Sequence, residues 1–250
     1  MASDRYIRLA SEQGGVARLD IHLPPVNVLR VADLDELSRV IEDAGVARVL
    51  VLSGLPRAFS AGVEIAEHVP ESAAIERMLA AMRGLLAALV ETPAVTVSVV
   101  SGSCLGGGAE IAAACDFVLT DDEARIGFPE IRLGCFPPAA AVLLPARVGE
   151  ARAVEWILTG KTFSGREAAQ AGFATRAVSA ESLEEEASSL ARELTSRGAR
   201  GLGAARDLLR AGRRHALATG LARAEDAYRK LEGDPDLTRA VREFKGRGSP

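Results

Sequence analysis

Cysteine and histidine are scarce in this sequence, with three of each among 250 residues. The cysteines are odd in number and none forms a Cys-x-x-Cys pair, so neither a disulfide framework nor a structural zinc site is indicated. The histidines are far apart and show no spacing that would bind a metal. We therefore expect no metal ion, and free thiols fit a protein of the reducing cytoplasm. The three cysteines are Cys104, Cys115 and Cys135.

Aromatic residues and an excess of positive charge are also lacking. The chain has one Trp, two Tyr and seven Phe, too few for a platform on which nucleic-acid bases could stack. Its 30 basic and 34 acidic side chains leave a net charge of −4. This balance argues against a nucleic-acid-binding protein, and we expect no nucleic-acid partner.

Long hydrophobic runs are missing as well. The longest uncharged stretch, Thr92–Ala109, contains a proline and four glycines and would be a poor membrane span. Residues 1–20 carry six charged side chains, so we expect no secretory signal and no membrane partner. The length and the mean hydropathy of +0.12 predict one core, or one core with an appendage.

The hydrophobic patterns that are present alternate between strand and helix over the first 120 residues. Two short apolar runs around a Gly-Gly pair predict a β-hairpin, and continuous β-branched runs predict buried strands. Strands connected through helices imply an α/β fold with a parallel sheet. The expected strands are Tyr6–Leu9, Val16–Ile21, Val46–Leu52, Val95–Val100 and Phe117–Thr120, and the expected helices are Val31–Ala44, Ala73–Val90 and Ala109–Ala114.

The last third of the chain predicts mostly helix. Ser164 and Glu167 have the spacing of a capping box that opens a helix. Four arginines on one later helix indicate a solvated or interface face, with contact to an anionic ligand as the alternative. The later helices are expected over Leu183–Arg197, Gly203–Leu217 and Leu221–Leu231, and the four arginines are Arg206, Arg210, Arg213 and Arg214.

Two glycine-containing turns could carry chemistry. Gly102–Glu110 is expected as a glycine-rich turn over residues 102–108 that leads into a helix. Its N–H groups at a helix start could hold a phosphate or a developing oxyanion; the alternative is a tight packing turn. The spacing is neither Gly-x-Gly-x-x-Gly nor a P-loop. Ala58–Glu64 is a second turn of small residues, which could complete an oxyanion hole or be an ordinary loop.

A pair of carboxylates follows these turns. Glu110 directly follows the glycines, and Glu130 lies between apolar residues, with Phe128 and Ile131 close by in the sequence. Such neighbours should desolvate the Glu130 carboxylate and raise its pKa. Two carboxylates in one apolar pocket can divide acid and base roles, as proton transfer next to a carbonyl requires. Taken singly, each could instead be a solvated surface glutamate.

Together these segments resemble the crotonase (enoyl-CoA hydratase/isomerase) superfamily over residues 7–178. Three motifs in the order of the family carry the resemblance. Arg57–Ile65 resembles the first oxyanion-hole turn, Gly102–Glu110 resembles the second, and Phe128–Gly134 resembles the segment of the second carboxylate. The resemblance implies a crotonase-type spiral of ββα turns with a C-terminal helical oligomerisation region.

The resemblance also implies roles for individual residues. The backbone N–H groups of Val63 and Gly107 would bind the thioester carbonyl oxygen and stabilise an enolate. Glu110 would activate a water molecule and Glu130 would deliver the α-proton. Twenty residues separate the two, as in family hydratases, and the presence of both favours hydration of an enoyl-CoA over isomerisation.

Further positions follow from the same resemblance. Coenzyme A is expected as part of the substrate, with no other cofactor. Two departures from the family concern the acyl pocket: Glu64 replaces a frequent Asp, and Cys135–Val142 replaces the Pro-Gly-x-Gly-Gly-Thr run of most hydratases. The expected CoA contacts are Arg57, Ala58, Ser60, Ala61, Phe244 and Arg247, and the expected acyl-pocket residues are Glu64, His68, Phe136 and Pro138.

Two short segments are similar to the cyclohexa-1,5-diene-carbonyl-CoA hydratase subgroup. These are Glu67–Pro70 and Pro137–Ala140, and they imply a cyclic dienoyl thioester as the substrate. Three alternatives stay open: a double-bond isomerase on the same fold, an acyl-CoA hydrolase on the same fold, and a non-catalytic acyl-CoA-binding subunit.

The family organisation implies two parts of the chain. Residues 1–195 would form the spiral core with the acyl-CoA site, and residues 196–250 would form a helical trimerisation region. Gly198 and Gly201 mark this boundary in the sequence. A short helical tail cannot bury its own apolar face, so we expect a homotrimer or homohexamer.

Overall fold

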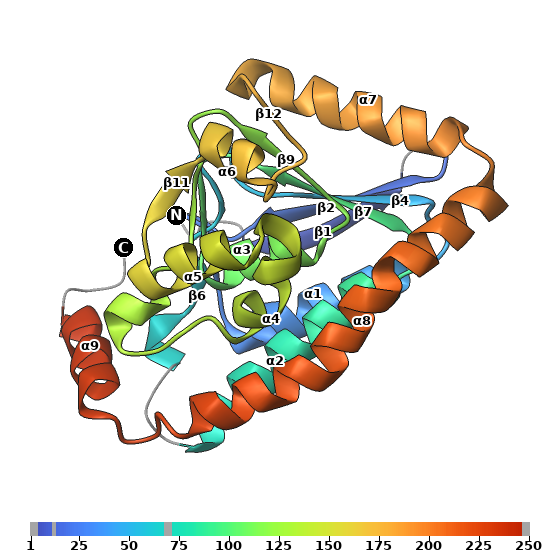
Figure 1. The fold of residues 1–250 in the computed structure, drawn as a ribbon. Helices are drawn as coiled ribbons and strands as arrows, with labels where there is room; N and C mark the ends of the chain where they lie inside the picture. Colours follow the sequence, from blue (N-terminus) through green and yellow to red (C-terminus); the bar gives the residue numbers. More distant parts are fainter. Residues whose placement is uncertain (1–4, 12–13, 68–71, 247–250) are drawn as a thin grey trace.

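The larger sheet of the computed structural model has six strands in the order β1-β2-β4-β7-β9-β12 (Figure 1). The structure describes residues 5–11, 14–67 and 72–246. β1 and β2 form the predicted antiparallel hairpin, and the remaining neighbours are parallel, as expected. The strands are β1 (Tyr6–Ser11), β2 (Val16–His22), β4 (Val49–Ser53), β7 (Val95–Val100), β9 (Phe117–Asp121) and β12 (Arg176–Val178).

Both faces of this sheet are covered, which explains its continuous apolar runs. In β4, Val49 and Val51 face one side and pack with α7 (Leu183–Ser196), while Leu50 and Leu52 face the opposite core. That opposite face is covered by α1 (Val31–Asp43) and α2 (Ser72–Glu91). Figure 1 shows α7 alone on its side of the sheet, away from α1 and α2.

Two smaller sheets lie beside the first and carry the glycine-containing turns. One has the strand order β11-β10-β8-β5, and the other pairs β3 with β6. The turn expected over residues 102–108 is shorter than predicted, because β8 lies within it and α3 (Gly107–Ala114) begins at its second-last residue. The strands are β3 (Val28–Leu29), β5 (Ala58–Ser60), β6 (Gly62–Val63), β8 (Ser103–Leu105), β10 (Arg125–Gly127) and β11 (Thr162–Ser164).

Helices form most of the chain after residue 128. The predicted capping box is confirmed: the Ser164 hydroxyl accepts from the Glu167 N–H and the Glu167 carboxylate accepts from the Ser164 N–H at the start of α6. The short helices are η1 (Ile65–Glu67), η2 (Pro129–Leu133) and η3 (Ala180–Ser182), and the α-helices are α4 (Pro138–Val148), α5 (Glu150–Thr159), α6 (Gly165–Ala171), α8 (Ala199–Arg229) and α9 (Pro235–Gly246).

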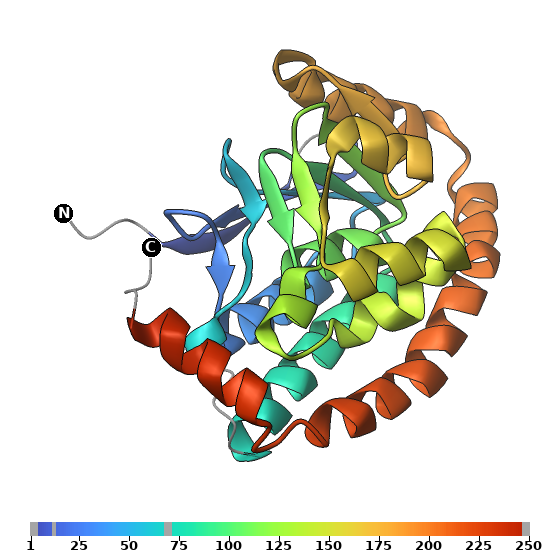
Figure 2. The same ribbon diagram turned by 60° about the vertical axis from the view of Figure 1, so that its left-hand side comes forward.

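The two separate helices expected within residues 203–231 are one helix. α8 has 31 residues and continues through Gly212 and Gly220, because it packs along α2 and α4 for much of its length. Figure 2 shows α8 following the outside of the molecule before the chain turns back into α9, which packs against η1 and η2. The division into residues 1–195 and 196–250 stays a prediction.

The arginines of α8 do not form the solvated face that the sequence gave as one possibility, because all four side chains are buried or half-buried within the chain. Arg210 is fully buried and donates to the Asp116 carboxylate, to Thr92 O at 2.6 Å and to Ala94 O at 2.7 Å. Arg213 donates to the same carboxylate at 2.6 Å. The Arg210 guanidinium thus pairs with the backbone carbonyls of Thr92 and Ala94, which follow the end of α2, and so holds α8 against the core.

The strand expected over residues 46–52 begins later than the sequence predicted. β4 starts at Val49, and Val46 is 96% exposed in the turn after α1.

Among the described residues, no helix has both the length and the apolar composition needed to cross a membrane.

Candidate active site

Two backbone N–H groups meet where β6 approaches the start of α3. A Cβ built on Gly62 would lie 3.7 Å from Gly107 N, and one built on Gly107 would lie 3.6 Å from Val63 N. The Glu64 N–H donates to Leu29 O on β3, so the N–H of the preceding residue, Val63, points away from β3. The N–H of Gly107 is the first of α3 and has no partner within the helix. The geometry fits a two-donor oxyanion hole.

Gly106 forms the sharp bend that aims these groups. It has φ +52° and ψ −126°, a conformation that side chains other than glycine avoid. A Cβ at this position would lie 2.5 Å from the Glu130 Oε1 atom. Glycine at 106 therefore both starts α3 and leaves room for the second carboxylate.

Glu110 lies one turn into α3 with its side chain buried. Its carboxylate Oε1 accepts from Ala139 N at 2.8 Å and from Ala140 N at 2.9 Å, at the start of α4. Burial raises the pKa of Glu110 to about 7, and these two hydrogen bonds oppose the rise. Glu110 is thus no surface glutamate.

Glu130 is held by η2 and has fewer partners. Its Oε2 atom is buried and finds no hydrogen-bond partner within the described part of the chain. Burial, and then the charge of Glu110, raise the pKa of Glu130 to about 8. The predicted desolvation of Glu130 is confirmed, and near neutral pH the pair holds about one proton.

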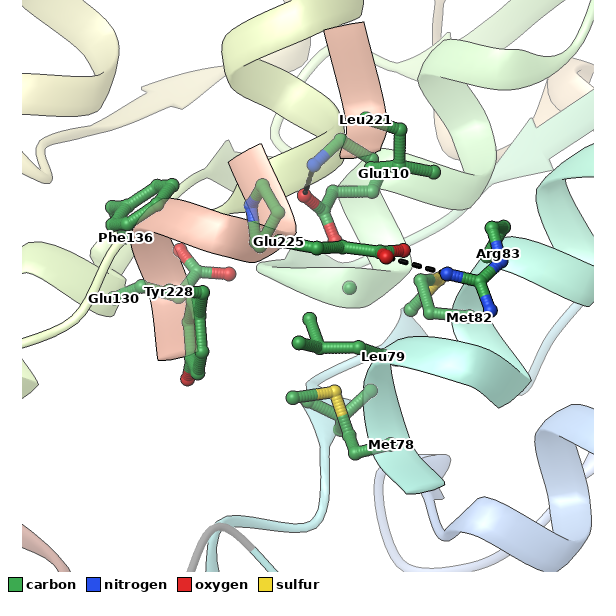
Figure 3. Close-up of a pocket in the computed structure, with 14 residues that line it drawn as sticks. Met78, Leu79, Met82, Arg83, Glu110, Glu130, Phe136, Leu221, Glu225 and Tyr228 are labelled. Atoms are coloured by element: carbon green, nitrogen blue, oxygen red, sulfur yellow. Dashed lines mark hydrogen bonds and ion pairs between the residues drawn. The ribbon is translucent and has the colours of Figure 1, made fainter. Parts of the chain in front are cut away.

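One cavity contains both glutamates and is shown in Figure 3. Its volume open to water is about 30 Å³, and a water molecule needs about 10–15 Å³ measured in this way. In this view Glu130 lies on one side, Arg83 and Glu225 lie on the other, and Glu110 lies between them. The lining residues are Val63, Met78, Leu79, Met82, Arg83, Gly107, Glu110, Glu130, Phe136, Pro138, Ala139, Leu221, Glu225 and Tyr228.

A second cavity of about 60 Å³ shares Val63, Gly107 and Glu130 with the first. It lies under α9, which contributes Leu237 and Val241 to its wall. Val63, Gly107 and Glu130 therefore lie between two adjoining cavities. The other lining residues are Ala61, Gly62, Ile65, Gly106, Pro129, Leu133 and Cys135.

The expected acyl-pocket residues are only partly brought together. Phe136 and Pro138 line the cavity of the glutamates. The Glu64 carboxylate accepts from the Ala66 N–H, and the residue lines neither of these two cavities. His68 lies outside the described residues.

The expected CoA contacts lie mostly along one turn. Arg57 is exposed and Ala61 lines the second cavity, whereas Ala58 is buried. The buried Ser60 hydroxyl donates to Asn27 O at 2.7 Å and accepts from the Gly62 N–H, so it supports the turn before Val63 from within. The Phe244 side chain and Arg247 lie outside the described residues.

Sequence reasoning missed the contribution of α8 to the cavity. Leu221, Glu225 and Tyr228 lie four and three residues apart, so they share one face of the helix. In the sequence, the available signal was the charged Glu225 between the apolar residues Leu221 and Tyr228 on one helix face. That pattern does not indicate which cavity the face lines. Arg83 on α2 was missed for the same reason.

Comparison with known proteins identifies the family. Residues 11–250 match the family model described as enoyl-CoA hydratase/isomerase. The chain belongs to this family. It is 31% identical over 193 residues to a probable enoyl-CoA hydratase of Rhizobium meliloti, covering 75% of each chain. It is 34% identical over 162 residues to the cyclohexa-1,5-dienecarbonyl-CoA hydratase of Thauera aromatica, covering 64% of this chain and less than two thirds, 62%, of that protein.

Solved structures of the family share the fold. An enoyl-CoA hydratase from Mycobacterium avium subsp. paratuberculosis superposes with a TM-score of 0.85 at 25% identity, over 98% of this chain and 97% of that one. The crotonase-type α/β fold predicted from the sequence is confirmed. The family also supports an enzyme of the enoyl-CoA hydratase type.

Proposed function

We propose that this protein adds water across the conjugated double bond of an acyl-CoA thioester. The observation that carries the proposal is the pair Glu110 and Glu130, which line one cavity together with Val63 and Gly107, whose N–H groups lie close together. Two carboxyls that share one proton near neutral pH supply both the base and the acid that hydration needs.

The environments of the two carboxyls assign their roles. Glu110 accepts two backbone hydrogen bonds, which favour its ionised form, so it is the base. Glu130 has an unpartnered oxygen among the described residues and faces the charge of Glu110, so it holds the proton and is the acid. This assignment agrees with the roles that the family resemblance implies.

The reaction then follows in balanced steps. The thioester oxygen binds to the N–H groups of Val63 and Gly107, which stabilise the negative charge that develops on it. Glu110 takes a proton from water as the water oxygen bonds to the β-carbon, and the π electrons move to form the enolate. Glu130 transfers its proton to the α-carbon, and exchange with solvent restores both carboxyls.

The substrate proposed in more detail is a cyclic dienoyl thioester. Pro137 and Pro138 replace the glycine-rich run of most family hydratases and begin α4 next to Phe136 at the cavity. The Thauera relative bears the name of a hydratase for such a substrate, which supports the same choice. We further propose that CoA lies along the turn of Arg57–Ala61 and that no other cofactor takes part.

Glu130→Gln tests the acid. The variant keeps the size of the side chain but cannot cycle a proton, so hydration should fall by about 10²–10⁴-fold. Loss of the absorbance of the conjugated thioester measures hydration, while titration with a saturated acyl-CoA should show unchanged binding.

The same assay separates the alternatives. Formation of the conjugated band from a β,γ-enoyl-CoA would indicate an isomerase, and release of free thiol would indicate a hydrolase. Full turnover by Glu130→Gln would contradict the proposed mechanism.

A further inference from the structure

A charged residue interrupts the apolar wall of the cavity opposite Glu130. Glu225 on α8 is 1% exposed and lines the cavity among Met78, Leu79, Met82 and other apolar residues. Its Oε1 atom is buried and finds no hydrogen-bond partner among the residues described. A buried carboxylate oxygen without a donor costs free energy, so a purely apolar acyl group would leave that cost in place.

The other carboxylate oxygen of Glu225 is already used. Oε2 accepts from the Arg83 guanidinium at 2.5 Å and lies 3.6 Å from Arg229. Arg229 also pairs with Glu76 and Asp226 on the outside of the molecule. These pairs fix the direction of the Glu225 carboxylate, with one oxygen engaged and the other left for a ligand.

The position of this oxygen indicates which part of the substrate it would meet. Val63 and Gly107, whose N–H groups would bind the thioester oxygen, line the same cavity, as does Glu110. Figure 3 shows the Arg83–Glu225 pair on the side of the cavity away from Glu130. A donor that reaches Glu225 therefore belongs to the part of the acyl group beyond the reacting carbons.

We propose that Glu225 is a specificity residue that accepts a hydrogen bond from a hydroxyl group on the acyl chain or ring of the substrate. The acceptor belongs to a buried carboxylate that is paired with Arg83, which makes such a bond strong and makes its absence costly. A site with a buried polar group discriminates against an analogue that lacks the matching donor. The proposal rests on the proposed acyl-CoA site and narrows its substrates, the cyclic dienoyl thioesters among them, to those whose acyl group carries a hydroxyl group.

Binding of unreactive ligand pairs tests this without relying on hydration. Calorimetry would compare 6-hydroxyhexanoyl-CoA with hexanoyl-CoA, and 4-hydroxycyclohexanecarbonyl-CoA with cyclohexanecarbonyl-CoA. In at least one pair the hydroxylated ligand should bind the wild-type protein at least tenfold more tightly. Equal or weaker binding of the hydroxylated member in both pairs would overturn the proposal.

Glu225→Met and a matched control locate the effect. Glu225→Met should abolish the preference by weakening the hydroxylated ligand at least tenfold, while the parent ligand binds as well or better. Arg83 is half exposed and can turn to solvent, so this variant leaves no buried unpaired cation at that position. Glu76→Gln removes an exposed carboxylate that pairs with the same Arg229 and should keep the preference. A preference that survives Glu225→Met would also overturn the proposal.

Failure of the proposed function gives a different result. Hydration of the matching 2-enoyl-CoA thioesters would be followed in parallel by loss of the conjugated band. If the parent and the hydroxylated substrate are hydrated with equal kcat/KM, the role of Glu225 is contradicted and the hydratase proposal is not. Absence of hydration together with a tenfold binding preference contradicts the hydratase and supports the role of Glu225.

Discussion

At the scale of the residue, the site depends on how neighbouring atoms divide one proton between Glu110 and Glu130. Both have a raised pKa through burial, but Glu110 accepts hydrogen bonds from the N–H groups of both Ala139 and Ala140, whereas Oε2 of Glu130 has no partner among the described residues. The motif order pointed to these two glutamates in the sequence. It could not point to Glu225, because a single glutamate on a long helix, 115 positions from Glu110, resembles any solvated one until the chain is folded.

The buried carboxyls make stability depend on pH. Glu130 has a pKa of about 8 when folded, above the ordinary 4.5, so the folded state binds the proton more strongly and its stability falls as the pH rises from about 4.5 to 8. Glu130→Gln has no charged form. At pH 8 its free energy of unfolding should exceed that of the wild type by at least about 1.4 kcal/mol, which is the energy that corresponds to one pKa unit.

Urea unfolding between pH 4 and pH 8 measures this difference, which should shrink towards pH 4. The exposed Glu42→Gln on α1 is the matched control and should show no such trend. A constant stability difference between Glu130→Gln and wild type at every pH would contradict the inferred burial.

At the scale of the element, the start of α3 fixes the geometry of the site. The sequence predicted a helix after the glycines, but not that it begins at Gly107 or that β8 lies before it. Hydrophobic periodicity does not report backbone angles, and the helix start depends on the positive φ of Gly106. Val46 shows the same limit, because a β-branched residue next to a strand can still lie in an exposed turn.

Gly106→Ala should therefore damage both stability and chemistry. The left-handed backbone would be strained by about 1–3 kcal/mol. The new Cβ would also lie 2.5 Å from Glu130 Oε1 unless the carboxylate moved, so kcat should fall. Gly212→Ala, within α8 and with no atom within 4 Å of the new Cβ, is the control and should stabilise by about 0.5–1 kcal/mol. Wild-type kcat in Gly106→Ala would contradict the proposed geometry.

At the scale of the whole molecule, α8 connects the core to the site. It was predicted as two helices with a break at residues 218–220, where Gly220 weakens the local helical signal, and tertiary packing overrides that signal. Its arginine row was interpreted as a solvated or interface face, because a sequence does not show the Asp116 and the carbonyls that Arg210 finds in the fold.

Exposed leucines on α8 bear on the predicted oligomer. Leu208 is 79% and Leu209 is 83% exposed on this one chain, next to each other. Such residues are candidates for contact with a second copy. We expect a native mass of about three or six times the 26.2 kDa of one chain, and a lower mass for Leu208→Asp/Leu209→Asp, by light scattering after gel filtration. A monomeric wild-type protein would contradict the prediction.

Because α8 is one continuous helix, the position of Arg210 fixes the direction in which Glu225 points around the helix axis. Arg210 is fastened to Asp116, and Glu225 faces the cavity about 22 Å, or about four turns, further along the helix. One residue inserted between them would turn Glu225 by about 100° relative to that fastening and replace it at the cavity by a neighbouring side chain. The cavity can therefore be re-lined by a change in the length of α8 as well as by a change of residue, and either change leaves both glutamates in place.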